Sequence, residues 1–483
     1  MNILNNRIKR LYRDYRHTIP TVNRLAIKKA KWYMDYDSPV VLMIDDLSNA
    51  WFSKEMDQLP IQAADWGGLH DQPNSAFHFL QEELLKQHPQ VKTVFFTVIG
   101  PLGPFVKGHP FTFCESFDHS ENSRKFLRML QFSTHFEVAY HGFQHGFPGI
   151  KKSDFIQEWE AFSNIAEMCE QNEKGNKLYE KLIGHKARGG KYGGWKYNTI
   201  ADSSIDTSGF EWWCRDWMPR DSDDRILDDY YEPQYFGKSK VVALPTTLHG
   251  RTWRSKQVEN LLKTKQIISI EEHIAKYKPG CPDQEPNIFD DIQELRRLFN
   301  LLKAKNVWYA KCSEIADYFD ARERTLLTDI TKDGFSLYYD GSRNVPFLTL
   351  IIDSKSICSQ KKPYIHIEMP NGALLSRQQY NYDNRKFLHK VTLPVFSGNY
   401  RVKSEAIMPP VLNGRIIGNA IELDQKGLCG KVILDGHQSK DSFRYYEKIP
   451  GVFDFLYKTA EGKGEIVCLN SNYSPEIMEV LKS

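Results

Sequence analysis

Two acidic residues and two histidines form the most informative pattern in this 483-residue chain. Asp45 and Asp46 end the apolar run 39–44, and His141 and His145 lie four residues apart. Histidines at this spacing share one face of a helical turn, so both rings can bind one cation. A carboxylate at a strand end supplies a third ligand, and three such ligands leave a position open for water. The pattern predicts a hydrolytic metal site in which one aspartate is free to act as a base.

Each part of this pattern also has a simpler explanation. Adjacent aspartates are common in turns, and a single pair of histidines four apart is a weak signal. The surrounding elements favour the metal site, because Phe136, Val138 and Tyr140 alternate before His141 as they would in a strand. Both halves of the pattern therefore follow strand-like runs, and ligand sites in α/β folds lie at the carboxyl ends of strands.

Strand-like and helix-like runs alternate over residues 38–325, which predicts parallel strands joined by helices. From residue 330 to 483, short alternating runs with Asn-Gly and Asp-Gly turns predict an antiparallel, sandwich-like β domain. Residues 1–37 are expected to form a basic amphipathic arm. Within the first region we expect a strand over 91–98 and helices over 76–86, 154–170, 176–183 and 288–303.

These motifs resemble, in order along the chain, those of the polysaccharide deacetylases of the NodB-homology type, also called carbohydrate esterase family 4. The resemblance covers roughly residues 38–320. It implies a distorted (β/α) barrel in which Asp45 is the catalytic base. The metal ligands would be Asp46, His141 and His145.

The family's third and fourth motifs have similar segments here. The sequence Arg-Gly-Gly-Lys-Tyr-Gly that begins at Arg188 is similar to the third motif, although its prolines are missing. The resemblance implies that Arg188 holds the base, and Tyr192 is assigned to substrate binding. Asp216 and Trp217 look like the fourth motif, in which the aspartate orients the arginine and the tryptophan lines the substrate site.

The fifth motif, a histidine at the end of a late apolar strand, has two candidates. His273 is preferred because a helix-like stretch over 288–303 and a strand over 307–310 follow it, as in the closing part of the family's barrel. It would donate a proton to the departing amine. His249 remains the alternative and is expected in a loop where it contacts substrate.

The resemblance implies a metal-dependent hydrolase that removes the N-acetyl group of an amino sugar in a glycan or glycan precursor. It is similar to deacetylase-like proteins of bacterial O-antigen clusters, which points to lipopolysaccharide and surface polysaccharide biosynthesis. Zn²⁺ suits two imidazoles and one carboxylate, but other first-row metals fit as well. Two alternatives stay open: a degenerate barrel that binds glycans or acts as a scaffold, and a metal hydrolase acting on another ester or amide.

Composition narrows the function classes. A net charge of +3 argues against a chain built to bind nucleic acid. Eight cysteines without a CxxC pair argue against a zinc ribbon or a disulfide framework. No apolar stretch approaches the ~20 residues of a membrane span, and the N-terminus lacks the pattern of a secretory signal. A cytoplasmic location is therefore expected.

The N-terminal arm has an uneven charge distribution. Residues 1–31 contain nine basic residues and one acidic residue, and Leu4, Ile8, Leu11 and Tyr15 recur among them at helical spacing. Such a segment suits peripheral contact with an anionic membrane surface. The alternative is a helix that packs the same apolar stripe on the barrel.

Overall fold

The computed structural model divides into two compact units, Asp37–Ala316 (the barrel unit) and Met1–Tyr36 with Asp317–Ser483 (the β unit). The structure describes residues 25–50, 66–73, 75–102, 107, 114–215, 232–274, 286–341, 347–370, 375, 380–383, 387–395 and 397–408. It also describes the backbone of strands at 413–417, 420–423, 431–433, 442–449, 452–458, 464–470 and 476–479. Among the described helices, none has both the length and the apolar character needed to cross a membrane.

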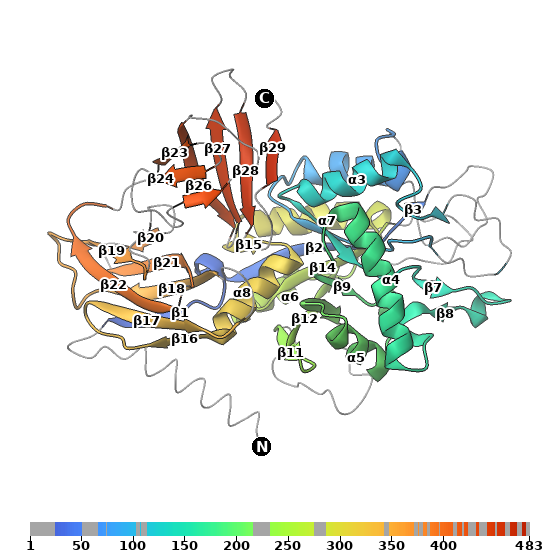
Figure 1. Ribbon diagram of the computed structural model, residues 1–483, viewed down its shortest axis with the longest axis horizontal. Coiled ribbons are helices and arrows are strands. Elements are labelled where there is room, and N and C mark those ends of the chain that lie inside the picture. Colours follow the sequence, from blue (N-terminus) through green and yellow to red (C-terminus); the bar gives the residue numbers. More distant parts are fainter. Residues whose placement is uncertain are drawn as a thin grey trace. The chain divides into compact units, whose positions relative to one another are not determined.

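A ten-stranded sheet forms the centre of the barrel unit (Figure 1). Its strands are β2 (Ser38–Leu47), β4 (Thr93–Thr97), β6 (Phe136–Tyr140), β9 (Gly189–Lys191), β10 (Trp212–Arg215), β11 (Gln234–Phe236), β12 (Val241–Pro245), β13 (Leu248–His249), β14 (Ile268–His273) and β15 (Val307–Tyr309). They follow the order β11-β12-β10-β9-β6-β4-β2-β14-β13, with β15 paired to β2. Every pairing is parallel except that of β11 with β12.

The connection between β12 and β13 requires this sheet to curl. The two strands lie at or near opposite ends of the strand order, yet only Thr246 and Thr247 separate them in the chain. So short a link spans roughly 10 Å at most. The two ends of the sheet therefore approach each other, which gives the distorted (β/α) barrel that the sequence predicts.

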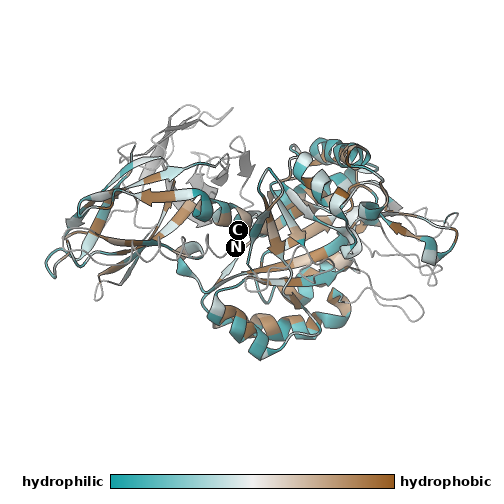
Figure 2. Ribbon diagram, turned by 90° about the horizontal axis from the view of Figure 1, so that it is seen from below, coloured by the Kyte–Doolittle hydropathy of each residue, from teal (hydrophilic) through white to brown (hydrophobic). Residues whose placement is uncertain are grey.

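Helices cover the sheet, and side chains cap the first turns of several of them. They are α2 (Ala76–Leu80) with the π-helix η4 (Gln81–Leu85), α3 (Glu121–Phe132), α4 (Ile165–Ile183), α5 (Thr199–Thr207), α6 (Ser255–Thr264), α7 (Ile288–Lys303) and α8 (Cys312–Arg324). Ser120, Asn164, Asn198 and Asn287 accept hydrogen bonds from backbone N–H groups at the starts of α3, α4, α5 and α7. Figure 2 shows that these helices mix hydrophilic and hydrophobic residues, whereas the strands beneath are mainly hydrophobic. All ten residues of β2 are buried, as expected of a parallel strand covered on both faces.

One predicted helix is only partly correct. Residues 154–170 do not form a continuous helix, because α4 begins at Ile165 after its cap Asn164. The chain before it forms a short hairpin of β7 (Gly146–Phe147) and β8 (Ile156–Gln157), followed by a 3-10 turn at Glu158–Glu160. This departure from helix places Glu158 in the interior, where it accepts a hydrogen bond from the backbone N–H of His145, one of the predicted metal ligands.

The β unit consists of antiparallel sheets, as predicted. One contains β1 (Ala26–Lys29), β18 (Phe347–Asp353), β21 (Leu388–Pro394) and β20 (Tyr380–Asp383), and another contains β16 (Thr325–Thr328), β17 (Gly334–Tyr339), β22 (Gly398–Glu405) and β19 (Tyr364–Glu368). Ile367 of β19 donates its backbone N–H to the Tyr380 hydroxyl, so these two sheets face each other. A third sheet has seven strands, β23 (Asn413–Ile417), β24 (Ala420–Leu423), β25 (Lys431–Ile433), β26 (Ser442–Ile449), β27 (Val452–Lys458), β28 (Gly464–Asn470) and β29 (Glu476–Glu479).

The boundary predicted for the N-terminal arm needs correction. Ala26–Lys29 form strand β1, which pairs antiparallel with β18. The end of the basic segment is therefore part of the β unit rather than of a separate arm. The apolar stripe from Leu4 to Tyr15 lies outside the described residues.

Candidate metal-dependent active site

Asp46, His141 and His145 converge on one point at the carboxyl ends of β2 and β6. The Nε2 atoms of His141 and His145 lie 3.2 and 3.0 Å from the same Asp46 oxygen, Oδ1. All three residues are buried, and their candidate ligand atoms lie within 4.8 Å of one another. Two imidazoles and one carboxylate in this arrangement are a donor set for a divalent cation.

The backbone that presents these ligands departs from regular structure. The pairing of β2 with β4 shifts in register between Ile44 and Leu47, and Asp46 within this irregularity has a φ of 63°. Gly142 and His145 also have positive φ values, of 106° and 67°. The prediction that the two histidines share a helical turn is therefore wrong, because the histidines lie in a bent loop after β6.

Glu158 stabilises the loop after β6 that carries His141 and His145. Its two carboxylate oxygens accept hydrogen bonds from the backbone N–H groups of Phe143, Gln144 and His145, at 3.0, 2.9 and 2.8 Å. A side chain at Gly142 would collide with this carboxylate, since an added Cβ would lie 2.6 Å from Glu158 Oε2. The loop conformation that brings both imidazoles together thus depends on a buried acid that no sequence motif had marked.

The surroundings of His141 fit a metal ligand. Its Nδ1 lies 2.9 Å from the backbone carbonyl of Lys191. A carbonyl only accepts hydrogen bonds, so Nδ1 carries the proton and Nε2 presents a lone pair toward Asp46 and His145. A carbonyl or carboxylate behind the ring is the usual support for a metal-binding histidine. Asp46, His141 and His145 are accordingly the residues that would hold a cation.

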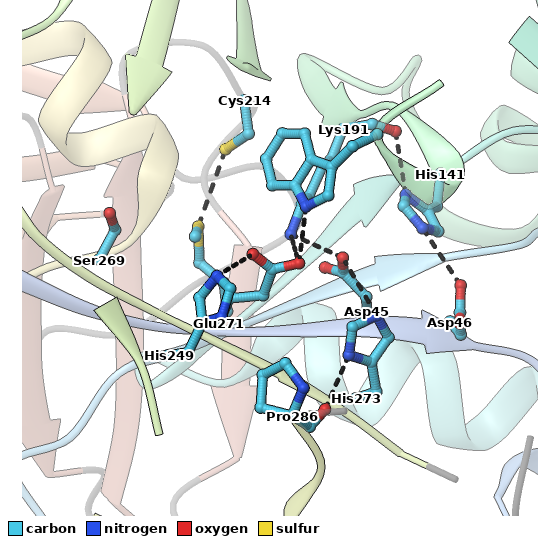
Figure 3. A network of polar contacts seen from close by, with 12 residues as sticks. Asp45, Asp46, His141, Lys191, Cys214, His249, Ser269, Glu271, His273 and Pro286 are labelled. Atoms are coloured by element: carbon cyan, nitrogen blue, oxygen red, sulfur yellow. Dashed lines mark hydrogen bonds and ion pairs between the residues drawn. The ribbon is translucent and has the colours of Figure 1, made fainter. Parts of the chain in front are cut away.

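Asp45 lies beside this triad and belongs to a separate charge network (Figure 3). Lys191 Nζ lies 2.6 Å from Asp45 Oδ2 and 3.0 Å from Glu271 Oε1. All three side chains are buried. Asp45, Glu271 and His273 are also close enough to ligate a metal, but the Lys191 ammonium already supplies the positive charge between the two carboxylates.

Burial and charge act in opposite directions on these groups. Burial raises the pKa of Asp45 above its ordinary value, with Lys191 opposing it. Burial also acts to raise the pKa of Glu271, but Lys191 and nearby histidines lower it below its ordinary value. Despite burial, the two carboxylates raise the pKa of Lys191. The lysine therefore stays charged, and Asp45 is the carboxylate that accepts a proton more readily.

The predicted partner of Asp45 must be corrected from Arg188 to Lys191. Arg188 precedes β9, and its guanidinium pairs with Glu211, whose backbone N–H also donates to the Arg188 carbonyl. Lys191 ends β9, three residues further along. The carboxyl end of the strand is the end that faces the site, so the last residue rather than the first reaches Asp45.

The two candidate histidines end adjacent strands. His273 is paired in register with Asp45, and its Nε2 lies 3.9 Å from Asp45 Oδ2. Its Nδ1 lies 2.8 Å from the Pro286 carbonyl, which fixes the ring. His249 is paired in register with Glu271, and its half-exposed ring places Nε2 3.6 Å from Glu271 Oε2. Both histidines are thus at the site, with His273 nearer the predicted base.

The remaining predicted residues divide into two groups. Tyr192 is completely buried, and its hydroxyl donates to Asp202 at 2.6 Å. Its ring stacks on Tyr197 with a centroid distance of 4.5 Å, so Tyr192 is a packing residue and the predicted substrate contact is wrong. Asp216 and Trp217 lie outside the described residues.

Trp195 joins the site although no motif pointed to it. Its indole Nε1 donates to Glu271 Oε1 at 2.9 Å, and the Lys191 ammonium lies 4.2 Å from its ring centroid. Trp195 has a φ of 53°, a conformation that costs a non-glycine residue on the order of 1 kcal/mol or more. The hydrogen bond and the cation–π contact offset this cost. A strained residue with two such contacts is typical of a functional site.

Comparisons with known proteins give distant similarities. No family model and no curated protein matches the chain. Among solved structures, a proposed polysaccharide deacetylase of Mycobacterium smegmatis covers 60% of this chain and 92% of its own at 15% identity, with a TM-score of 0.37. A similar protein of Pseudomonas aeruginosa PAO1 covers 60% of this chain and 93% of its own, at 14% identity and a TM-score of 0.38.

A pseudoenzyme of the CE4 family from Bacillus anthracis also matches, over 59% of this chain and 66% of its own, at 12% identity and a TM-score of 0.30. The names of these structures, polysaccharide deacetylase and CE4 family, are those of the family that the sequence motifs resemble. At such identities and TM-scores the matches do not assign an activity, which must be argued from the residues of this chain.

Proposed function

We propose that this protein is a metal-dependent deacetylase that hydrolyses the N-acetyl group of an amino sugar in a glycan or glycan precursor. One observation carries the proposal: three buried ligands, Asp46, His141 and His145, converge beside a fourth residue, Asp45, that is not among them. A carboxylate next to a cation site, but bound to lysine instead, has the position of a general base.

Each of these residues has a separate role in the proposed reaction. A divalent metal, when bound, would polarise the acetyl carbonyl and make the attacking water more acidic. Asp45 accepts the proton of that water, and its burial favours this transfer. Lys191 holds Asp45 in place through a 2.6 Å ion pair. His273, oriented by the Pro286 carbonyl, supplies the proton that the departing amine requires.

Zinc is the metal we expect at the triad, because imidazole and carboxylate ligands suit it. Acetate release from N-acetylhexosamine oligosaccharides and from nucleotide-linked N-acetylhexosamines tests the proposal. We expect activity that chelator removes and Zn²⁺ restores. Asp45→Asn should keep its metal yet lose turnover by about 10²-fold or more.

The same assay extended to esters and non-sugar amides has two results that would favour other functions. A metal-loaded protein with no hydrolytic activity would support a degenerate, glycan-binding barrel. Hydrolysis of esters or non-sugar amides without release of acetate from any amino sugar would support a hydrolase of another class. Loss of metal in Asp45→Asn would exchange the roles of the two aspartates.

The proposal extends to surface polysaccharide biosynthesis in the cytoplasm, with peripheral membrane contact through the basic N-terminal segment. Its charge, with nine basic residues among 1–31, supports attraction to anionic lipid. The deletion that tests it removes residues 1–24 and keeps Ala26–Lys29, which form β1. Sedimentation with anionic liposomes should be lost on deletion and weakened by salt. Unchanged sedimentation would contradict the membrane contact.

A further inference from the structure

The two carboxylate oxygens of Glu271 differ in their hydrogen-bond partners. Oε1 accepts the indole N–H of Trp195 and contacts Lys191. Oε2 is buried and has no hydrogen-bond donor among the described residues. His249 Nε2 lies 3.6 Å from it, slightly beyond hydrogen-bonding distance. A buried, ionised oxygen without a donor is costly, so this position calls for a hydrogen-bond partner.

The residues around Glu271 Oε2 include partly exposed side chains, whereas the residues of the metal triad are all buried. His249 is half exposed, with 51% of its side-chain surface accessible. Trp195 is partly exposed and is fixed by its hydrogen bond to Glu271 and by the Lys191 ammonium over its ring. An aromatic plane, a carboxylate oxygen and an imidazole meet here beside Asp45, which shares Lys191 with Glu271.

We propose that Trp195, Glu271 and His249 form a subsite for the hydroxyl-bearing ring of a sugar next to the scissile acetamide. A sugar hydroxyl both donates and accepts, so it can donate to Glu271 Oε2 while it accepts from His249 Nε2. The apolar face of a pyranose ring packs on an indole, as aromatic side chains with one polar handle do at binding sites. This inference rests on the proposed function and names the residues that select its substrate.

The subsite explains why Trp195 is held in a strained backbone conformation. Gly194 and Trp195 both have positive φ values, of 56° and 53°, and the turn they form directs the indole to Glu271. Packing alone does not require this, because the same turn with glycine would avoid the strain. The strain is retained where a ring must be presented in one orientation.

The test compares two substrates of the metal-loaded enzyme: an N-acetylglucosamine trisaccharide and p-nitrophenyl acetate, which has no sugar ring. For His249→Gln, the ratio of kcat/KM for the trisaccharide to that for the ester should fall about 3- to 10-fold, the scale of one hydrogen bond. The change should appear in KM more than in kcat. Trp195→Leu should lower the same ratio about tenfold or more.

His119→Gln is the matched control. His119 is 59% exposed and lies 3.1 Å from Glu115, so it is another histidine–glutamate pair on the surface of the barrel unit. The ratio should be unchanged in this variant. Equal ratios in wild type, His249→Gln and Trp195→Leu would overturn the subsite while leaving the deacetylase proposal intact. Failure of the wild-type protein to hydrolyse either substrate, with metal bound, would overturn both.

Discussion

The two halves of the candidate site are built on different principles. The metal half consists of Asp46, near the end of β2, and of His141 and His145, in the loop after β6, and only β4 separates these two strands in the sheet. The charge half combines Asp45 of β2 with Glu271 of the neighbouring strand β14 and with Lys191, whose strand β9 is separated from β2 by β6 and β4. Lys191 ends β9 and Glu271 lies in β14, and the two meet only because the sheet curls.

This difference determines which substitutions each half tolerates. A metal half depends on ligand type and on loop geometry, so one missing ligand removes its function. A charge half contains a buried cation between two buried anions, so it depends on the balance of all three. Removing the cation leaves two buried carboxylates uncompensated, whereas removing the cation together with one carboxylate leaves only one.

The largest effect is expected in the metal half. Asp46→Ala, His141→Ala and His145→Ala should each weaken metal binding by more than the 10–100-fold typical of outer-shell partners, and activity should fall with it. Metal content by elemental analysis and metal affinity by titration measure this. Full metal occupancy in all three variants would show that these three residues do not bind the metal.

The next largest effect, a loss of amide hydrolysis, is expected from substitution of His273. This loss is distinguished from a loss of metal because both rates are measured with metal bound. His273→Gln should lower amide hydrolysis by about 10²-fold or more, the usual scale for a lost general acid. Hydrolysis of p-nitrophenyl acetate should fall much less, because p-nitrophenolate leaves without a proton. Both rates are measured on metal-saturated protein. Equal losses on both substrates would mean that His273 does not protonate the leaving group.

The charge half is tested by a pair of substitutions that distinguish Lys191 from Arg188. Lys191→Met leaves two buried carboxylates facing each other, and it should cost about 3–5 kcal/mol of unfolding free energy. Turnover should fall because Asp45 loses its partner. Arg188→Met removes a partly exposed ion pair with Glu211 and should cost on the order of 1 kcal/mol with turnover retained. Denaturant unfolding and kcat on the same samples compare the two.

A double substitution sharpens the same comparison. Lys191→Met with Glu271→Leu removes one cation and one anion, so part of the stability lost in Lys191→Met should return. No recovery would show that Lys191 does not compensate the Glu271 carboxylate, contrary to what their 3.0 Å ion pair implies.

The sequence predicted the metal half better than the charge half for physical reasons. Asp45, Asp46 and His141 follow apolar strands directly, so the rule for strand ends locates them. The same rule would have selected Lys191 over Arg188 had the short strand 189–191 been recognised, but two glycines hide its periodicity. Glu271 and His273 are two residues apart on one strand and so share a face, a signal that was present. Trp195 and Glu158 lack any such signal, because their contacts come from turns between elements.

The smallest predicted effect concerns Glu158, which links the metal half to its loop. Glu158→Gln keeps the shape of the side chain but leaves one acceptor oxygen for the three backbone N–H groups of Phe143, Gln144 and His145. The loop should loosen, and metal affinity should fall about tenfold while kcat at saturating metal is largely kept. Glu167→Gln is the control, since Glu167 also accepts from a backbone N–H, that of Ser163, but is exposed. If both variants bind metal as tightly as the wild type, the geometry of the metal half does not depend on the Glu158 carboxylate, and other contacts hold the loop that carries its two histidines.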